Sequence, residues 1–215
     1  MNYTKTLRQF CMKNKGNVFD AAKMAEDYFS MIPYKTLLKI LNRLQSEGLL
    51  SPISKGVYQI IADEPINKED AIKSTYVDLY NGMYVGYKMY NHLGISPHND
   101  GYIEIYTNKI TTKHKNIANF KLTRANVFFD KVTTDIIQAL ELIENIDNIK
   151  DIDFSRYYEL RQRVIHSYND NDFYDIINEL TYQYSTIATF DMLVKEHTSN
   201  KCNCAKIYQH SIMKK

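Results

Sequence analysis

Side chains able to bind a polyanion gather in one short segment of the N-terminal quarter of this chain. They combine cations, hydroxyls and one amide: Tyr34, Lys35, Thr36, Lys39, Asn42, Arg43 and Lys55. Lysine and arginine bind phosphates or guanine edges, and asparagine can pair with adenine through two hydrogen bonds. The set therefore predicts contacts to a duplex nucleic acid.

A single helix must present most of these side chains. Pro33 fits the first residue of that helix and Gly48 the residue after its end. Its apolar positions follow helical spacing along one side: Leu37, Ile40, Leu41 and Leu44. Lys35, Lys39 and Asn42 fall on the other side, so one face packs and the other is presented. Because the N-terminal part of a recognition helix meets base edges, Tyr34, Lys35, Thr36 and Lys39 are favoured over Arg43.

The flanking pattern predicts two more helices and a hairpin. Helical spacing begins at Tyr3 and begins again over Val18, Ala22, Ala25 and Phe29. Residues 49–53 and 57–61 are typical of two strands, joined by a turn at 54–56 that carries Lys55 at its tip. Such a cation suits an adjacent phosphate or the minor groove. Three helices followed by a hairpin predict a winged helix-turn-helix over residues 1–62, a DNA-binding domain.

The remainder predicts a second domain over residues 71–215, after a polar linker at 63–70. Residues 73–93 are expected to be helical in places, interrupted at Gly82 and Gly86. Strands are expected in three ranges: 102–106, 117–122 and 126–129. About three helices are expected between 132 and 197. The fold class is therefore α+β, an N-terminal winged helix-turn-helix followed by a mixed domain with a small β-sheet and a helical C-terminal half.

Charge divides the chain in the same way. Residues 1–62 hold nine Lys or Arg against four Asp or Glu, a net +5. Residues 130–196 hold six bases against fourteen acids, a net −8. A basic segment suits a polyanionic partner. The acidic helical region could face a basic partner, although a solvated helix face is the more ordinary interpretation.

Other clusters of reactive residue types are weaker. Asp151 and Asp153 have the spacing of a magnesium pair, but no phosphate loop precedes them and they lie in a helix-rich acidic stretch, so surface positions are expected. Neither a P-loop, a His-Glu-x-x-His motif nor a nucleophile elbow is present, so neither an enzyme nor a cofactor is expected.

The C-terminal tail carries zinc-type ligands in an unfavourable spacing. They are His197, Cys202, Cys204 and His210. Cys-x-Cys departs from the usual gap of zinc sites, and the tail is expected to be poorly ordered, so no metal is predicted. Tyrosines 76, 80, 84, 87 and 90 have near-helical spacing, which is more typical of a core than of a stacking platform for bases.

Composition indicates a cytoplasmic protein without a membrane partner. The three cysteines are too few for a disulfide framework and fit a reducing compartment. No apolar run approaches the roughly 18 residues that would span a bilayer, and Met1 to Lys15 lacks the apolar core of a secretory signal.

Two segments carry a resemblance to a known family. The first segment, 19–60, contains the motifs Phe-Asp-Ala-Ala, Leu-Asn-Arg-Leu-Gln-Ser-Glu-Gly-Leu-Leu and Lys-Gly-Val-Tyr. The second segment, 84–109, contains the motifs Asn-His-Leu-Gly-Ile-Ser and Tyr-Ile-Glu-Ile-Tyr-Thr-Asn. Together they resemble AbiEi-type antitoxins, transcriptional autoregulators of type IV toxin–antitoxin, or abortive-infection, systems. The likeness covers about residues 17–145.

The resemblance implies two functions. The N-terminal domain would repress the promoter of its own operon by binding double-stranded DNA, at repeats in the operator, and the C-terminal domain would counter a partner toxin of nucleotidyltransferase type. An alternative is a stand-alone winged-helix regulator whose C-terminal domain senses a ligand or dimerises. A winged helix that binds proteins without DNA is a third.

Overall fold

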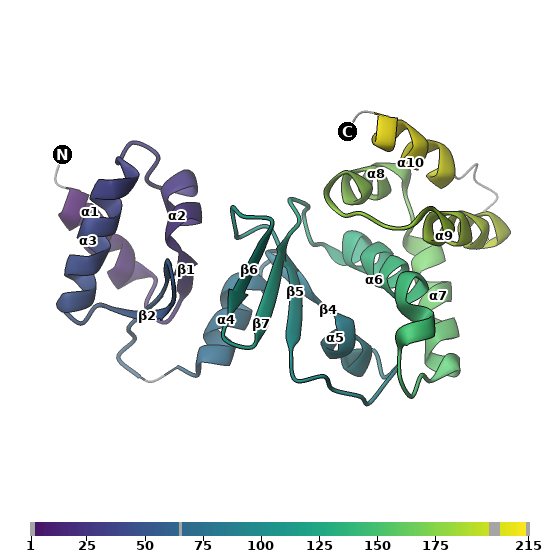
Figure 1. Cartoon of the computed structure of the whole chain (residues 1–215), viewed down its shortest axis with the longest axis horizontal. Helices are drawn as coiled ribbons and strands as arrows, with labels where there is room; N and C mark the ends of the chain where they lie inside the picture. The colour runs from purple at the N-terminus through teal and green to yellow at the C-terminus, as the bar shows by residue number, and fades with distance from the viewer. Residues whose placement is uncertain (1–2, 65, 198–202, 214–215) are drawn as a thin grey trace.

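The computed structural model describes residues 3–64, 66–197 and 203–213. Within these residues it contains ten α-helices, one 3-10 helix and two small sheets, which confirms the α+β class. An N-terminal group of helices with its small sheet lies at one end of the long axis, the second sheet lies in the middle, and the C-terminal helices lie at the other end (Figure 1).

The N-terminal unit interleaves three helices with a three-stranded antiparallel sheet of order β1-β3-β2. In chain order its elements are α1 (Tyr3–Lys13), β1 (Val18–Asp20), α2 (Ala21–Asp27), α3 (Tyr34–Ser46), β2 (Leu50–Ser54) and β3 (Val57–Ile60). Its own core, here the N-terminal core, is drawn from all three helices and includes Leu7, Met24 and Leu41. The three predicted helices and the hairpin are therefore present.

Strand β1 was not predicted, because Val18 was assigned to the second helix. Instead Val18 pairs with Gln59 of β3. The helix begins later, at Ala21, because the Asp20 carboxylate caps it by accepting hydrogen bonds from the backbone N–H groups of Ala22 and Lys23.

The second sheet has four strands in the order β4-β5-β7-β6, with β5 and β7 parallel and the other pairs antiparallel. Its elements and their helices are α4 (Lys68–Tyr76), β4 (Gly82–Val85), α5 (Gly86–His92), β5 (Ile103–Thr107), β6 (His114–Ile117) and β7 (Phe120–Arg124). In Figure 1, β6 is the edge nearest the N-terminal unit, and α5 and α6 lie toward the C-terminal side of the sheet.

Three local predictions for this region were wrong, and a fourth was right in part. The polar stretch at 63–70 is helical from Lys68, because Asn67 caps α4 by accepting a hydrogen bond from the N–H of Glu69. The stretch 73–93 is helical in places and interrupted at Gly82, as predicted, but the interruption is strand β4, and Gly86 begins α5. The strand expected at 117–122 is divided by a turn in which Ala118 has φ of 53°. Residues 126–129 form no strand; instead Val127 and Phe129 are buried in the core.

The C-terminal half is helical: α6 (Lys131–Asn145), the 3-10 helix η1 (Ile146–Asn148), α7 (Phe154–Ser167), α8 (Asp170–Glu179), α9 (Tyr184–His197) and α10 (Cys204–Met213). Four α-helices rather than three therefore occupy residues 131–197. The expectation of a poorly ordered tail was wrong for the part described, because α10 buries Cys204 and Tyr208. Cys202 lies outside the described residues.

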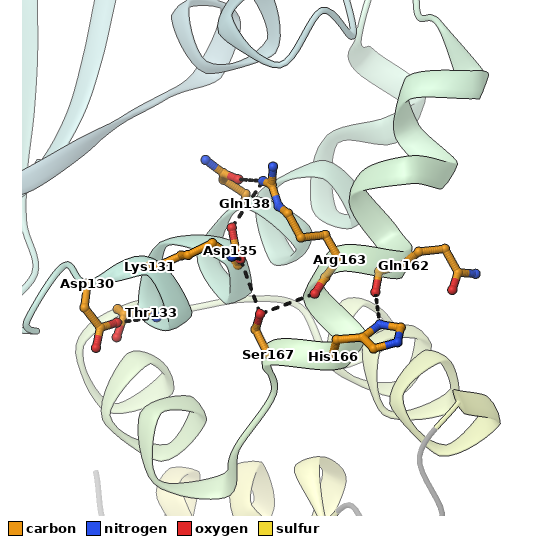
Figure 2. Close-up of polar contacts among 9 residues, drawn as sticks. All are labelled: Asp130, Lys131, Thr133, Asp135, Gln138, Gln162, Arg163, His166 and Ser167. Carbon is orange, nitrogen blue, oxygen red and sulfur yellow. Dashed lines mark hydrogen bonds and ion pairs between the residues drawn. The ribbon is translucent and has the colours of Figure 1, made fainter.

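A buried carboxylate joins α6 to α7. Asp135 lies within 3.1 Å of Lys131 Nζ and 3.2 Å of an Arg163 guanidinium nitrogen. The Ser167 hydroxyl donates to the same carboxylate at 3.5 Å, and Arg163 also donates to Gln138 at 2.7 Å (Figure 2). These partners offset part of the cost of burying the charge of Asp135.

A third cluster of buried residues, here the shared core, includes side chains from both sheets. Val18 and Val57 of the N-terminal sheet belong to it together with Ile72 of α4, Ile105 of β5 and Ile117 of β6. The division into two domains at 63–70 stays a prediction. None of the described helices is long and apolar enough to cross a membrane.

Candidate nucleic-acid interface

Helix α3 has one buried and one exposed face, as its sequence predicts. Leu37, Leu41 and Leu44 have no measurable exposure, and Ile40 is 8% exposed. Tyr34, Lys35, Lys39, Asn42 and Arg43 are all exposed. Among the described residues neither Lys35 nor Lys39 makes an ion pair with an acidic side chain. Two ammonium groups one helical turn apart are therefore available to an anion outside the protein.

The start of α3 provides a hydroxyl donor. Tyr34 is 44% exposed. Partial burial, together with the nearby Asp20 carboxylate and Tyr58, raises its pKa. The phenol therefore stays protonated at neutral pH and can donate a hydrogen bond to a phosphate. Thr36 is half-buried, and its backbone N–H bonds to the Pro33 carbonyl at 2.8 Å, in the first turn.

Arg43 is held near the C-terminal end of α3. Its Nε lies 3.2 Å from Glu47, whose other carboxylate oxygen lies 2.6 Å from an Arg8 nitrogen of α1. Arg8 and Glu47 were not among the residues predicted from the sequence. The Arg43–Glu47 spacing of four residues was a signal for the local pair, but nothing local indicated Arg8.

The turn between β2 and β3 carries exposed Lys55 at its tip, as predicted. Gly56 there has φ of 73°, a conformation that favours glycine. The carbonyl of Gly56 accepts a hydrogen bond of 2.8 Å from the N–H of Ala21, the first residue of α2. This bond fixes the turn, and with it Lys55, relative to the helices.

An ion pair joins the two sheets. Lys115 of β6 donates to the carboxylate of Asp20, which is 5% exposed. Asp20 thus caps α2, lies near Tyr34 and contacts the second sheet. Lys115 and Asp20 are 95 positions apart in sequence, so no local pattern could have identified the pair.

The other sequence clusters do not form sites among the described residues. Asp151 is exposed, and Asp153 is the N-cap of α7 rather than a strand residue. No group of three described His, Cys, Asp or Glu side chains could hold a metal ion. Cys204 is buried beside the Tyr168 hydroxyl at 3.1 Å, and His210 is exposed. The side chain of His197 lies outside the described residues.

The tyrosine series 76–90 does not share one helix, since it spans α4, β4 and α5. Tyr76 and Tyr90 are buried, as a core interpretation predicts, and Tyr84 and Tyr87 are half-buried. Tyr80 is 55% exposed and stacks on Phe128, with ring centroids 4.8 Å apart.

No protein-family model matches the chain, and no curated protein is detectably similar in sequence.

Proposed function

We propose that residues 1–62 are a winged helix-turn-helix that binds duplex DNA, and that the chain represses its own promoter. Support comes from the element order α1-β1-α2-α3-β2-β3 and from the pairing of both β1 and β2 with β3. In this arrangement α3 is the recognition helix and the β2–β3 turn is the wing.

The observation that carries the proposal is the exposed face of α3. Lys35, Lys39 and Asn42 share that face, while the leucines of the opposite face are fully buried. Lysines that form no ion pair within the described chain can bind the phosphates of DNA. Asn42 has the side-chain amide that can pair with adenine. Arg43, already paired with Glu47, is assigned to backbone contact rather than to a base.

Substitution of two lysines tests this role. The double variant Lys35→Ala, Lys39→Ala should bind the DNA upstream of its own gene more weakly. The salt dependence should also flatten, by about 0.9 in the slope of log K against log salt for each phosphate that the variant no longer neutralises. Fluorescence anisotropy over a salt series measures both quantities.

A matched control removes two exposed lysines elsewhere. Lys150→Ala, Lys206→Ala makes the same change in net charge, but on the C-terminal half. It should retain the wild-type affinity and slope. Equal affinities for the wild type and the α3 variant, or equal weakening in the two variants, would contradict DNA binding by α3.

We further propose that residues 71–215 act as an antitoxin against a nucleotidyltransferase-type toxin encoded beside this gene. The proposal rests on the resemblance over residues 17–145 to AbiEi-type antitoxins, and the role is one of binding or regulation rather than catalysis. Co-expression with the neighbouring gene tests it. Growth should be rescued by the full chain and also by its Lys35→Ala, Lys39→Ala variant. A neighbour that does not inhibit growth would remove the antitoxin role.

One observation favours the alternative of a regulator with a ligand-sensing C-terminal half. A cavity of about 590 Å3 lies between the second sheet and α6. Its volume is in the range of small-molecule pockets, about 300–1,000 Å3. In this alternative the neighbouring gene has no toxicity for the chain to relieve, while the DNA-binding result is unchanged.

A further inference from the structure

The cavity between the second sheet and α6 is polar because of the alternation of its strands. On the side facing α6, Glu104 of β5 is in register with Lys121 of β7, and Lys121 with Asn116 of β6. The next row places Tyr106, Thr123 and His114 side by side. The opposite side of these strands carries shared-core residues such as Ile105 and Leu122, together with Lys115, which pairs with Asp20. On β5, β7 and β6 the side facing α6 therefore carries polar groups, while on β4 the same side carries the buried Met83 and Val85.

Glu141 of α6 lies at the wall of this cavity and is the acid it encloses most deeply. Only 7% of Glu141 is exposed. Its Oε1 accepts hydrogen bonds from the hydroxyls of Tyr106, at 2.7 Å, and Tyr182, at 3.0 Å. Among the described residues, its Oε2 accepts one hydrogen bond, from the Asn145 amide at 3.5 Å. One carboxylate oxygen therefore retains most of its capacity to accept a hydrogen bond.

Glu141 differs from the other buried acids in that it forms no ion pair with any described residue. Asp20 pairs with Lys115, Asp135 with Lys131 and Arg163, and Asp191 with Lys195. These acids and Glu141 are the buried Asp and Glu residues of the described chain. Among the described residues no lysine, arginine or histidine forms an ion pair with Glu141. A buried acid without such a partner is favoured in its neutral form, and a cation brought beside it would favour the ionised form.

The other charged side chains of the cavity do not supply a cationic partner for Glu141. Lys121 lies 3.8 Å from Glu104 and 3.9 Å above the ring of Tyr102. Glu144 accepts hydrogen bonds from the N–H of Gln183 and the hydroxyl of Thr186, at the start of α9. The lining holds four acids, Asp100, Glu104, Glu141 and Glu144, against one lysine. Acids therefore outnumber bases in the lining, which favours a cation over an anion as ligand.

The geometry indicates an organic cation rather than a metal ion. No three described carboxylate, imidazole or thiol groups converge closely enough to hold a metal. The lining also includes the aromatic residues Tyr87 and Tyr90, a residue type that attracts organic cations. We propose that this cavity binds a small organic cation whose ammonium or guanidinium group pairs with Glu141.

Binding should depend on pH because Glu141 must ionise to pair with a cation. Burial raises the pKa of Glu141, the Tyr106 and Tyr182 hydroxyls lower it, and the Glu144 and Glu104 carboxylates raise it. Tyr90 of α5, His114 of β6 and Lys121 of β7 complete the titratable groups of the lining near it, with Asp100 and Tyr87 at other parts of the wall. Affinity for a cation should therefore be low at acidic pH, where Glu141 is protonated, and increase as the pH rises.

Titration with agmatine, which carries a guanidinium and a primary amine, tests the proposal on the full chain. Isothermal calorimetry should show saturable binding, tighter at higher pH than at lower pH, while the uncharged 1,4-butanediol should not bind. Glu141→Gln should weaken agmatine binding by about tenfold or more, the usual effect of removing a charge-assisted hydrogen bond. Glu26→Gln, the same substitution at an exposed site on α2, should bind as the wild type does.

Amide chemical shifts separate the cavity from general attraction to the acidic half of the chain. Agmatine should shift the amides of residues that line the cavity, such as Thr123, Asn145 and Thr181, and these shifts should disappear in Glu141→Gln. No saturable binding, equal affinity in Glu141→Gln, or shifts spread over α7 and α8 would each overturn the proposal. DNA binding by α3 is measured separately and stands whatever the result.

Discussion

Glu141 and Asp135 lie six positions apart on α6, and both are buried, yet only Asp135 has cations beside it. Asp135 is explained by packing, because its ion pairs join α6 to α7. Glu141 joins α6 to Tyr106 and Tyr182 through hydrogen bonds alone. Replacing such a group should reveal whether the folded protein is stabilised or destabilised by its charge.

Glu141→Gln should change the free energy of unfolding by an amount that depends on pH. The folded protein raises the pKa of Glu141, so the unfolded chain loses this proton at lower pH than the folded one. The stability contributed by Glu141 is therefore complete below about pH 4.3, its unfolded pKa, and falls as pH rises toward the folded pKa. Glutamine does not titrate and can still accept from both tyrosines. The variant should gain stability relative to the wild type between about pH 5 and about pH 8.

Urea unfolding at the two pH values measures this gain. A tenfold difference between the folded and unfolded acid dissociation constants corresponds to about 1.4 kcal/mol. Glu26→Gln, on an exposed part of α2, should show no such change between the two pH values. A stability difference between Glu141→Gln and the wild type that is the same at both pH values would show that burial does not disfavour the ionised carboxyl.

At the residue scale, the exposure of a side chain can be predicted from the sequence when it depends on the position of the residue around a single helix. The lysines of α3 were placed correctly because helical spacing fixes which side chains share a face. Glu141 was not identified as a candidate, since its environment depends on Tyr106 and Tyr182, which are 35 and 41 residues away. The usable signal was weak: an acid in an otherwise apolar helical stretch, following the buried Leu140.

Among the elements, helices were predicted better than strands. Gly82 shows why. It was taken to interrupt a helix, but it is the first residue of β4, where a Cβ would lie 2.2 Å from the carbonyl oxygens of both Tyr106 and Tyr76. Glycine is needed there because two backbone segments approach it, and such an approach is set by tertiary structure rather than by local pattern.

The strands of the second sheet show a related limit. The apolar residues Ile117, Phe120 and Leu122 were combined into one strand, yet a turn at Ala118 places the first in β6 and the others in β7. All three are buried in the shared core. Hydrophobicity therefore identified which side chains pack, while the turn, at a non-glycine residue with positive φ, carried no clear sequence signal.

Across the whole molecule, the shared core connects the proposed DNA-binding unit to the second sheet. Val18 and Val57 pack with Ile105 and Ile117. Thr75 of α4 exchanges hydrogen bonds of 3.0 Å with the backbone of Val18, and Lys115 pairs with Asp20. The Gly56–Ala21 bond places Lys55 beside this junction. Destabilising the second sheet should therefore also destabilise the unit that contains α3.

Ile117→Ala tests this coupling in the full chain. Ile117 has no measurable exposure, and truncating a buried isoleucine costs about 2–5 kcal/mol. If the two sheets open together, hydrogen exchange of the Leu41 amide in α3 should accelerate along with that of β5 and β7.

Ile177→Ala is the matched control: Ile177 is 1% exposed, and the core to which it belongs contains no described residue from 1–62. It should accelerate exchange in α8 more than in α3. Faster exchange in β7 with unchanged exchange at Leu41 would instead show that the N-terminal unit is independent, and that α3 binds DNA on a domain whose stability owes nothing to the rest of the chain.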